Sequence, residues 1–198
     1  DDYNRLIAEV KFLRAYFCLY LIDLYGDVPL LIERTSLENS QMPRTPVSEI
    51  VDFLLAELDE IVRHLPSNVN MKDRVTSGAV LALKSRIALH HERWNEAISA
   101  AEQLINEESY VLHDNFGELF MYAGENSQEI IFSIQYLEGQ QTHPLAQNYY
   151  SRMALGHSNT KPSQSLVDSY ESVDGLSIDE SHIYDRVRNE VPCYANGW

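Results

Sequence analysis

The sequence predicts a mainly α-helical protein in which helical hairpins are followed by a loop-rich region with little β structure. Apolar residues of the first half repeat with the helical period, and Pro or Gly residues end these periodic runs. After residue 110 the helical periodicity is lost. We therefore expect a helical scaffold over residues 1–110 and a loop-rich region over residues 111–198.

Six apolar residues predict a long first helix, because they recur at spacings of three and four. They are Leu6, Val10, Leu13, Phe17, Leu21 and Leu24. A second apolar face contains Phe12, Tyr16, Leu19 and Tyr20. A helix with two apolar faces is expected to pack between other helices. Gly26 and Pro29 predict where it ends.

The pair Thr45-Pro46 predicts the start of the second helix, with the Thr45 side chain as its cap. Apolar residues then recur at spacings of three and four, and Pro66 ends the helix. The recurring residues are Ile50, Leu54, Leu58, Ile61 and Leu65.

A second helical pair is expected over residues 79–105, with a turn near residues 91–93. The small residues Ala97 and Ala101 predict a close approach of its two helices. Two antiparallel hairpins with alanines at the crossings indicate a tetratricopeptide-like architecture, although the second hairpin carries the pattern better than the first.

The region after residue 110 contains one predicted strand, at residues 129–136, where apolar and polar residues alternate. Residues 138–165 are polar and aperiodic and predict a loop, and residues 165–172 predict a short helix.

Composition excludes several functions. The chain has 198 residues, enough for one domain with or without an appendage. It carries 15 Lys and Arg against 30 Asp and Glu, a formal charge of −15, which disfavours binding to nucleic acid or to an anionic membrane surface. No apolar run reaches the roughly 18 residues of a membrane span. Residues 1–10 are acidic and helix-like rather than a signal peptide, which favours a fragment or a processed product.

The chain has two cysteines, Cys18 and Cys193, too few for a disulfide-dense scaffold or a multi-cysteine zinc site. Cys18 lies in an apolar helical stretch and is expected to be buried. The sequence leaves open whether the two cysteines form a bridge.

No motif predicts catalysis, so we expect no enzyme, no cofactor and no metal site. The sequence has no GxSxG, P-loop or GxGxxG pattern. The adjacent His90 and His91 would point about 100° apart on a helix, which does not suit a shared metal ion. The abundant carboxylates, such as Glu57, Asp59 and Glu60, are typical of a solvated helix face.

Aromatic residues are also abundant, with 12 Tyr, 6 Phe and 2 Trp, and they are more informative about function than the carboxylates. Tyr and Trp join a flat apolar face to a polar tip, which suits sugar rings and protein interfaces alike. Tyr149, Tyr150 and Trp198 lie in polar, aperiodic segments and therefore belong to no predicted core stripe.

Five segments, taken in order, resemble the SusD/RagB family of glycan-binding surface lipoproteins of Bacteroidetes. They are residues 11–30 (KFLRAYFCLYLIDLYGDVPL), 44–66, 78–105, 129–136 and 162–175. Each segment alone is generic, but their succession is specific and covers roughly residues 5–175.

The resemblance implies a tetratricopeptide-like scaffold with a loop-rich part that helps to form a glycan site. It implies a lipid-anchored protein at the outer face of the outer membrane. Such a protein captures oligo- or polysaccharide without cleaving it and delivers it to a SusC-like TonB-dependent transporter. The family's signal peptide and lipidated cysteine are not in this sequence, and its members are usually much longer.

The resemblance assigns no binding residue, because glycan contacts in the family come largely from variable loops. From residue type and position we expect ligand contacts at Asn148, Tyr149, Tyr150, Arg152 and Trp198. Arg14 and Arg86 lie among apolar helical residues and are expected to be packed, ion-paired parts of the scaffold.

Two other functions stay open. A tetratricopeptide-type adaptor would bind a protein partner and no carbohydrate. A glycoside hydrolase would need two carboxylates that converge on a cleft.

Overall fold

The computed structural model describes residues 2–34, 36, 41–67, 74–106, 110–137, 139–140, 142–143, 145–150, 153 and 155–183. The α-helices are α1 (Asp2–Tyr25), α2 (Val47–Ile61), α3 (Ser77–His90), α4 (Trp94–Asn106), α5 (Leu145–Tyr149) and α6 (Gln164–Asp168). The 3-10 turns are η1 (Val62–His64), η2 (Glu118–Phe120) and η3 (Tyr122–Gly124). An antiparallel bridge joins Val28 to Thr45. The prediction of a mainly α fold with helical hairpins and little β structure is confirmed.

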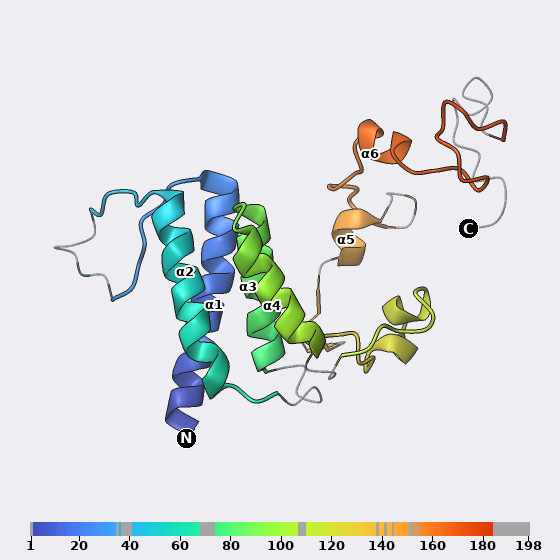
Figure 1. The fold of residues 1–198 in the computed structure, drawn as a ribbon. Coiled ribbons are helices and arrows are strands. Elements are labelled where there is room, and N and C mark those ends of the chain that lie inside the picture. The colour runs from blue at the N-terminus through green and yellow to red at the C-terminus, as the bar shows by residue number, and fades with distance from the viewer. Residues whose placement is uncertain are drawn as a thin grey trace. The chain divides into compact units, whose positions relative to one another are not determined.

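The four long helices form two consecutive antiparallel hairpins, α1 with α2 and α3 with α4 (Figure 1). The chain divides into two compact units, Asp1–Gln135 and Tyr136–Trp198. The first unit contains the hairpins and continues past residue 110, where we expected the scaffold to end.

Helix α1 ends where the sequence predicts. Gly26 adopts a left-handed backbone with φ +68°, and its N–H donates to the Ile22 carbonyl oxygen at 3.0 Å. A residue with a Cβ is strained in this conformation, which is why glycine commonly follows the last turn of a helix.

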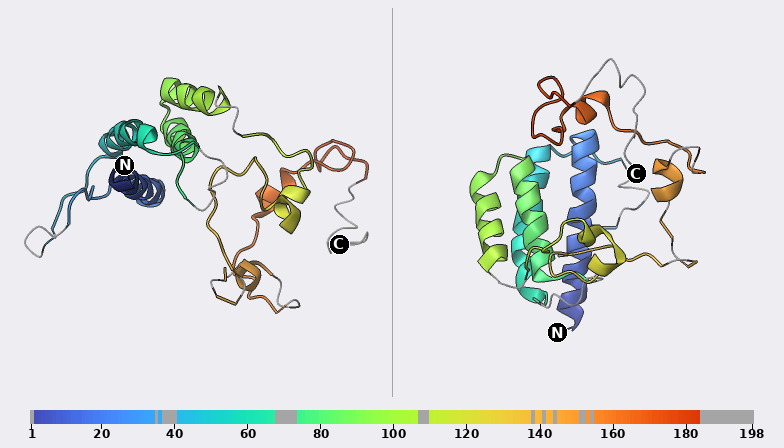
Figure 2. Two further views of the ribbon diagram at one scale, coloured as in Figure 1. Left: turned by 90° about the horizontal axis from the view of Figure 1, so that it is seen from below. Right: turned by 90° about the vertical axis from the view of Figure 1, so that its right-hand side faces the viewer.

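The buried face of α1 is not the stripe of large residues that begins at Leu6. The helix buries Ala8, Phe12, Ala15, Leu19 and Ile22, whereas that stripe is exposed. Small side chains at Ala8 and Ala15 allow the neighbouring helices to approach closely, and this close packing outweighs the greater apolar area of the leucines. Within the described part of the first unit, α1 packs on α2, η1 and α3 through this face alone, contrary to the expectation that it packs between helices (Figure 2).

Helix α2 begins at Val47, one residue later than expected, and Thr45 does not cap it. The Thr45 N–H donates to the Val28 carbonyl oxygen at 2.9 Å, so this residue belongs to the bridge. Asp27 supplies the cap instead, because its Oδ1 accepts the Val47 N–H at 2.9 Å. The carboxylate of Asp27, distant in sequence, thus bonds to an N–H group of the first turn, where the sequence pattern predicted the nearby Thr45 hydroxyl.

The core lies between α1, α2 and α3. The predicted stripe of α2 is confirmed, since all five of its residues are buried: Ile50, Leu54, Leu58, Ile61 and Leu65. From α3, Val80 and Ile87 are fully buried against them.

The second hairpin is built as the sequence predicts. The Thr76 Oγ1 caps α3 by accepting the Ala79 N–H at 3.2 Å. Glu92 makes the turn to α4 with φ +60°. Ala97 and Ala100 are the buried residues of α4, whereas Ala101, which we expected at the crossing, is only partly buried.

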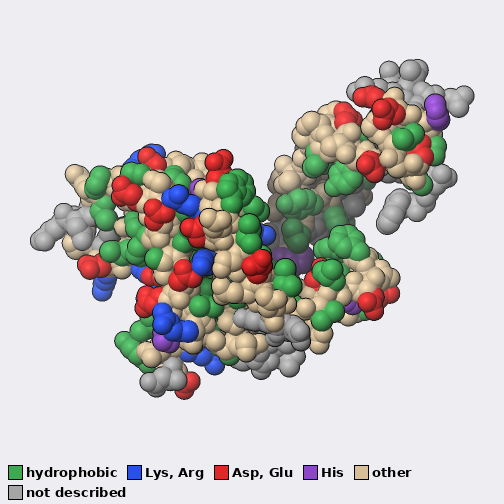
Figure 3. Space-filling view, viewed as in Figure 1, with side chains coloured by type: hydrophobic (Ala, Val, Ile, Leu, Met, Phe, Trp, Pro, Cys, Tyr) green, Lys and Arg blue, Asp and Glu red, His purple; other side chains and the backbone are tan. Residues whose placement is uncertain are grey.

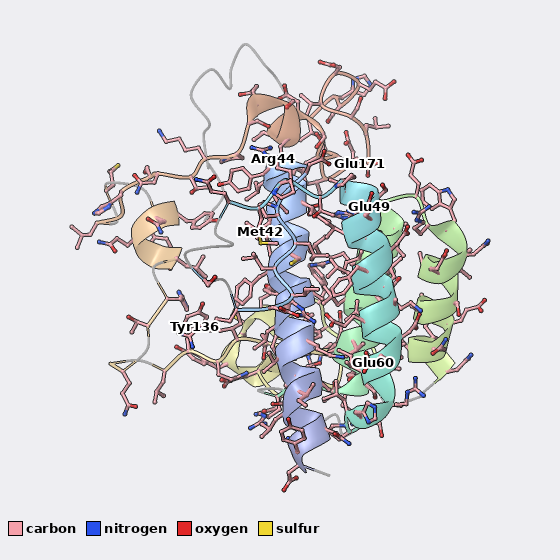
Figure 4. The ribbon with its side chains drawn as sticks, turned by 90° about the vertical axis from the view of Figure 1, so that its left-hand side faces the viewer. Met42, Arg44, Glu49, Glu60, Tyr136 and Glu171 are labelled. Carbon is pink, nitrogen blue, oxygen red and sulfur yellow. The ribbon has the colours of Figure 1, made fainter. Side chains whose placement is uncertain are left out.

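Charged side chains connect α1 to α2 on the flank of the core. Arg14 forms an ion pair with the buried Glu57, and Lys11 Nζ lies 2.7 Å from Glu60 Oε2. Figure 4 labels Glu60 on α2, together with Met42 and Arg44 on the segment that leads into this helix. The ion-paired role predicted for Arg14 is confirmed.

Arg86 was also expected to be a packed, ion-paired part of the scaffold, but it is exposed. Lys84 lies two residues earlier on α3, is buried, and donates to Asp59 Oδ1 at 2.5 Å. Two positions along a helix change the direction of a side chain by about 200°, so the wrong basic residue was assigned to the packed side.

The expected strand at residues 129–136 is absent, since none of these described residues is in a β-strand. A strand needs a neighbouring strand to complete its backbone hydrogen bonds, and the described part of the chain places none beside it. The segment instead packs on α1 through Phe132, whose ring meets the Phe12 ring edge-on at a centroid distance of 5.5 Å.

Cys18 is partly buried on α1, and burial raises the pKa of its thiol, partly offset by the nearby Arg14. Cys193 lies outside the described residues, so the possible bridge stays untested.

Candidate functional site

The predicted ligand-binding residues Asn148, Tyr149 and Tyr150 lie on and directly after the short helix α5, in the second unit. The backbone of this helix is tied to residues 157–159. The His157 N–H donates to the Gln147 carbonyl oxygen at 2.6 Å, and the Asn159 N–H donates to the Asn148 carbonyl oxygen at 2.9 Å. These bonds hold residues 147–150 beside residues 157–159, and we call these two stretches the α5 loop.

Gly156 is required for this closure. A Cβ at this position would lie 2.2 Å from the Tyr150 carbonyl oxygen, closer than real Cβ contacts allow. The Tyr150 carbonyl oxygen also accepts the Ser158 N–H at 3.1 Å and the Ser158 Oγ at 3.2 Å. The backbone at Tyr150 is thus held from the other arm of the loop, which orients the tyrosine.

Both tyrosine side chains are available to a ligand. Tyr149 and Tyr150 are each 57% exposed, whereas aromatic side chains are more often largely buried. Beside them the partly buried Asn148 keeps its side-chain oxygen against Asn159 Nδ2 at 3.3 Å. The loop therefore presents two apolar ring faces next to amide groups that donate and accept hydrogen bonds.

The other two predicted residues, Arg152 and Trp198, lie outside the described residues. Asn148, Tyr149 and Tyr150 lie together because they are neighbours in sequence.

A polar pocket that the sequence analysis missed lies in the first unit, between residues 111 and 128. Its volume is about 330 Å³. Its polar lining residues are His113, Asp114, Asn115, Glu118, Ser127 and Gln128. The pocket is shaped by two local bonds: the His113 N–H donates to Glu129 Oε2 at 2.8 Å, and Asn115 Oδ1 accepts the Gly117 N–H at 3.0 Å.

The chemistry of this pocket is hydrogen bonding. Its carboxylates, amides and hydroxyl can bond to a polar ligand, but Asn115 and Glu118 already bond to one another, at 3.1 Å. The sequence signal that could have found it is the turn-forming pair Asp114-Asn115 directly before the exposed Phe116.

On the face shown in Figure 3, Asp and Glu side chains on the helices are interspersed with Lys and Arg and with apolar side chains. In the described part of the chain no three His, Cys, Asp or Glu side chains gather where they could hold a metal ion. His90 pairs with Asp23 through Nδ1, 3.8 Å from Oδ2, rather than with His91. Among the described helices, none combines the length and apolar character that crossing a membrane requires.

Comparison with known proteins places the chain among SusD-like proteins, although no protein-family model matches it. A SusD-like protein of Formosa agariphila is 26% identical over 134 residues, which are 66% of this chain and 25% of that protein. The chain thus spans about a quarter of the length of this curated relative.

Two crystal structures show the same fold over most of the chain. A SusD-like carbohydrate binding protein of Bacteroides fragilis is 28% identical, with a TM-score of 0.78 over 88% of this chain and 35% of that one. A second SusD-like protein of Bacteroides fragilis is 30% identical, with a TM-score of 0.74 over 89% of this chain and 37% of that one.

Proposed function

The chain belongs to the SusD/RagB family, and from this premise we propose that the protein captures oligo- or polysaccharide at the cell surface. The observation that carries the proposal is the likeness to the SusD-like carbohydrate binding protein of Bacteroides fragilis, because it extends over 88% of the chain at a TM-score of 0.78. A fold shared at this level includes both the helical hairpins and residues beyond them.

The site that we propose is the α5 loop, residues 147–150 and 157–159. A sugar ring stacks its C–H face on Tyr149 or Tyr150, and its hydroxyls bond to polar groups such as those of Asn148. Arg152 and Trp198 are proposed as further contacts. Each contact displaces water, so a single site binds with modest affinity.

We further propose that the protein passes the captured glycan to a SusC-like TonB-dependent transporter while a lipid anchor holds it at the outer membrane. This step follows from the family premise. The net charge of −15 disfavours nucleic acid and anionic lipid surfaces as alternative partners.

The proposal excludes turnover. Glycosidic bond cleavage needs two carboxylates placed across a cleft, with one kept protonated at neutral pH. The Lys11 side chain bonds to Glu60 and lowers the pKa of that carboxyl. A lowered pKa is opposite to what a general acid needs.

The test is isothermal titration of the full-length protein against a panel of polysaccharides, together with analysis of the glycans after long incubation. We expect binding to at least one polysaccharide and no new reducing ends. Release of shorter sugars would instead support a glycoside hydrolase. Failure to bind any glycan, with capture of a defined protein partner, would support the tetratricopeptide-type adaptor.

A further inference from the structure

The chain has no Lys or Arg between Arg93 and Arg152, although it carries nine Asp and Glu residues over the same stretch. The polar pocket at residues 111–128 and residues 147–150 of the α5 loop both lie within this stretch. A long segment with carboxylates and no cations creates a negative local potential, which selects the charge of a ligand that binds there. This feature therefore bears on the kind of glycan that the protein captures.

The walls of the polar pocket are held by contacts within the segment itself. The Glu129 carboxylate accepts the His113 N–H at 2.8 Å, and this bond joins the two ends of the segment. Between these ends η3 lies directly against η2, because a Cβ at Gly124 would overlap the Glu118 carbonyl oxygen and the Leu119 Cα. A site whose walls are already fixed loses little conformational entropy when it binds a ligand.

Several polar groups of the pocket are available to a ligand. Within the described part of the chain, the exposed side chains of Asp114 and Gln128 make no hydrogen bond or ion pair. Asn115 Nδ2 donates one hydrogen to Glu118 Oε1 at 3.1 Å and keeps a second. Sugar hydroxyls both donate and accept hydrogen bonds, so they match this set of groups. The volume of about 330 Å³ lies within the range of small-molecule sites.

Exposed aromatic rings accompany these polar groups. Phe116 lies in sequence between the lining residues Asn115 and Glu118, and it is 75% exposed. Its ring meets the similarly exposed Phe120 ring edge-on, at a centroid distance of 5.1 Å. Tyr122, on the next turn, is almost fully exposed. Ring faces near amide groups are also present in the α5 loop, and they suit the C–H face and the hydroxyls of a sugar.

The charge of the pocket decides which sugars it can take. Asp114 and Glu118 line it, and Glu129 lies against it through its bond to the His113 N–H. Among its described lining residues only His113 can carry a positive charge, and its Nε2 already lies 3.9 Å from Glu118 Oε2. A uronate or sulfated sugar would bring its charge well within the Debye length of about 8 Å, with no cation to pair with it. Uncharged sugars avoid this repulsion.

We propose that the polar pocket at residues 111–128 is a further glycan subsite, and that it binds uncharged sugar residues. This inference rests on the proposed function, because it assumes that the protein captures glycans. A polysaccharide presents many copies of the same unit, so the pocket and the α5 loop can each bind a unit, and two weak sites together raise the apparent affinity.

The first test measures the ligand class with the purified full-length protein, by isothermal titration against two sets of polysaccharides. The uncharged set contains glucans, arabinoxylan, galactomannan and a fructan, and the anionic set contains polygalacturonate, alginate and κ-carrageenan. We expect binding within the uncharged set and none within the anionic set. The affinity should not change between low and high salt, because an uncharged ligand makes no ion pair with the protein.

The second test measures the pocket, with the uncharged polysaccharide that wild type binds most tightly. Asp114→Ala with Gln128→Ala removes two side chains that make no bond in the fold, so the unfolding midpoint should stay unchanged. We expect this variant to bind about three- to tenfold more weakly, as for the loss of one or two hydrogen bonds. The matched control is Glu96→Ala with Gln103→Ala on α4, which removes the same charge and the same amide from an exposed surface and should bind like wild type.

Footprinting of the unmodified protein gives a readout that needs no variant. The bound polysaccharide should protect Phe116 and Phe120 from hydroxyl radicals, relative to the exposed Trp94 on α4. Equal oxidation of these rings with and without the polysaccharide would overturn the subsite.

The outcomes separate this inference from the proposed function. Binding to an uncharged polysaccharide that the pocket variant leaves unchanged would keep the proposed function and refute the subsite. Tighter binding to the anionic set would keep the proposed function and refute the ligand class. A wild-type protein that binds neither set would refute the proposed function, and the inference with it.

Discussion

The two hairpins and the segments that follow them hold their conformations by different means. Helix α2 buries seven of its residues and contributes most of the largest fully buried side chains among the described residues. Helices α5 and α6 are one turn each, and α6 buries none of its residues. The loop around α5 is held by backbone hydrogen bonds and by Gly156. Packing determines the first region, whereas local backbone geometry determines the second.

Truncating the core should have the largest effect. Leu58→Ala removes a side chain with no exposed surface from the centre of the helical scaffold. We expect the free energy of unfolding to fall by about 2–5 kcal/mol, because both apolar burial and packing are lost. Chemical denaturation of the full-length protein measures this loss.

The matched control for Leu58 is Leu166→Ala on α6, a leucine that is 49% exposed. We expect its effect to stay below about 0.5 kcal/mol, as for most surface changes. Equal losses at both leucines would show that the two regions do not differ as described.

Removing the buried carboxylate of the scaffold should have the next largest effect. Glu57→Gln leaves Arg14 without its ionic partner in a partly buried position. We expect a loss of about 2 kcal/mol, less than for a fully buried pair because Arg14 retains contact with water.

Asp52→Asn is the control for Glu57, since Asp52 pairs with Arg93 where both side chains are exposed. Its loss should be below about 0.5 kcal/mol in the same denaturation experiment. A loss at Asp52 as large as that at Glu57 would contradict the role assigned to burial.

The smallest effect concerns pH. The Lys11 side chain bonds to Glu60 and lowers the pKa of that carboxyl, so the ionised form is favoured in the folded protein. The resulting stabilisation is present above the ordinary carboxyl pKa and is lost as the pH falls through the lowered value. Thermal unfolding of wild type and Glu60→Gln should therefore differ at neutral pH and converge in acid; a difference that does not vary with pH would refute this pairing.

How far the sequence predicted the fold depended on the kind of signal. The stripe of α2 and the stop at Gly26 were predictable because each follows from a local period or a single backbone requirement. The buried face of α1 was not, because its two alanines matter only in the presence of neighbouring helices. Asp27 as the cap of α2 is a long-range bond that no spacing reveals.

The candidate site was predictable only as a cluster. Tyr149 and Tyr150 could be singled out because aromatic residues in a polar, aperiodic segment belong to no core stripe, and they are indeed exposed. The closure of their loop could not be predicted, because it depends on bonds between residues 147–150 and residues 157–159. The polar pocket at residues 111–128 could not be predicted from the sequence, because its lining residues are of ordinary surface types and only the fold of the chain brings them together.

The most direct test of the account is the glycan affinity of the full-length protein carrying Tyr149→Ala and Tyr150→Ala together, compared with Tyr170→Ala. Tyr170 belongs to the same unit and is 69% exposed, so it controls for the loss of any surface tyrosine. The account predicts that the double variant binds its polysaccharide at least about tenfold more weakly, with an unchanged unfolding midpoint, while Tyr170→Ala binds like wild type. A double variant that binds as tightly as wild type would contradict it.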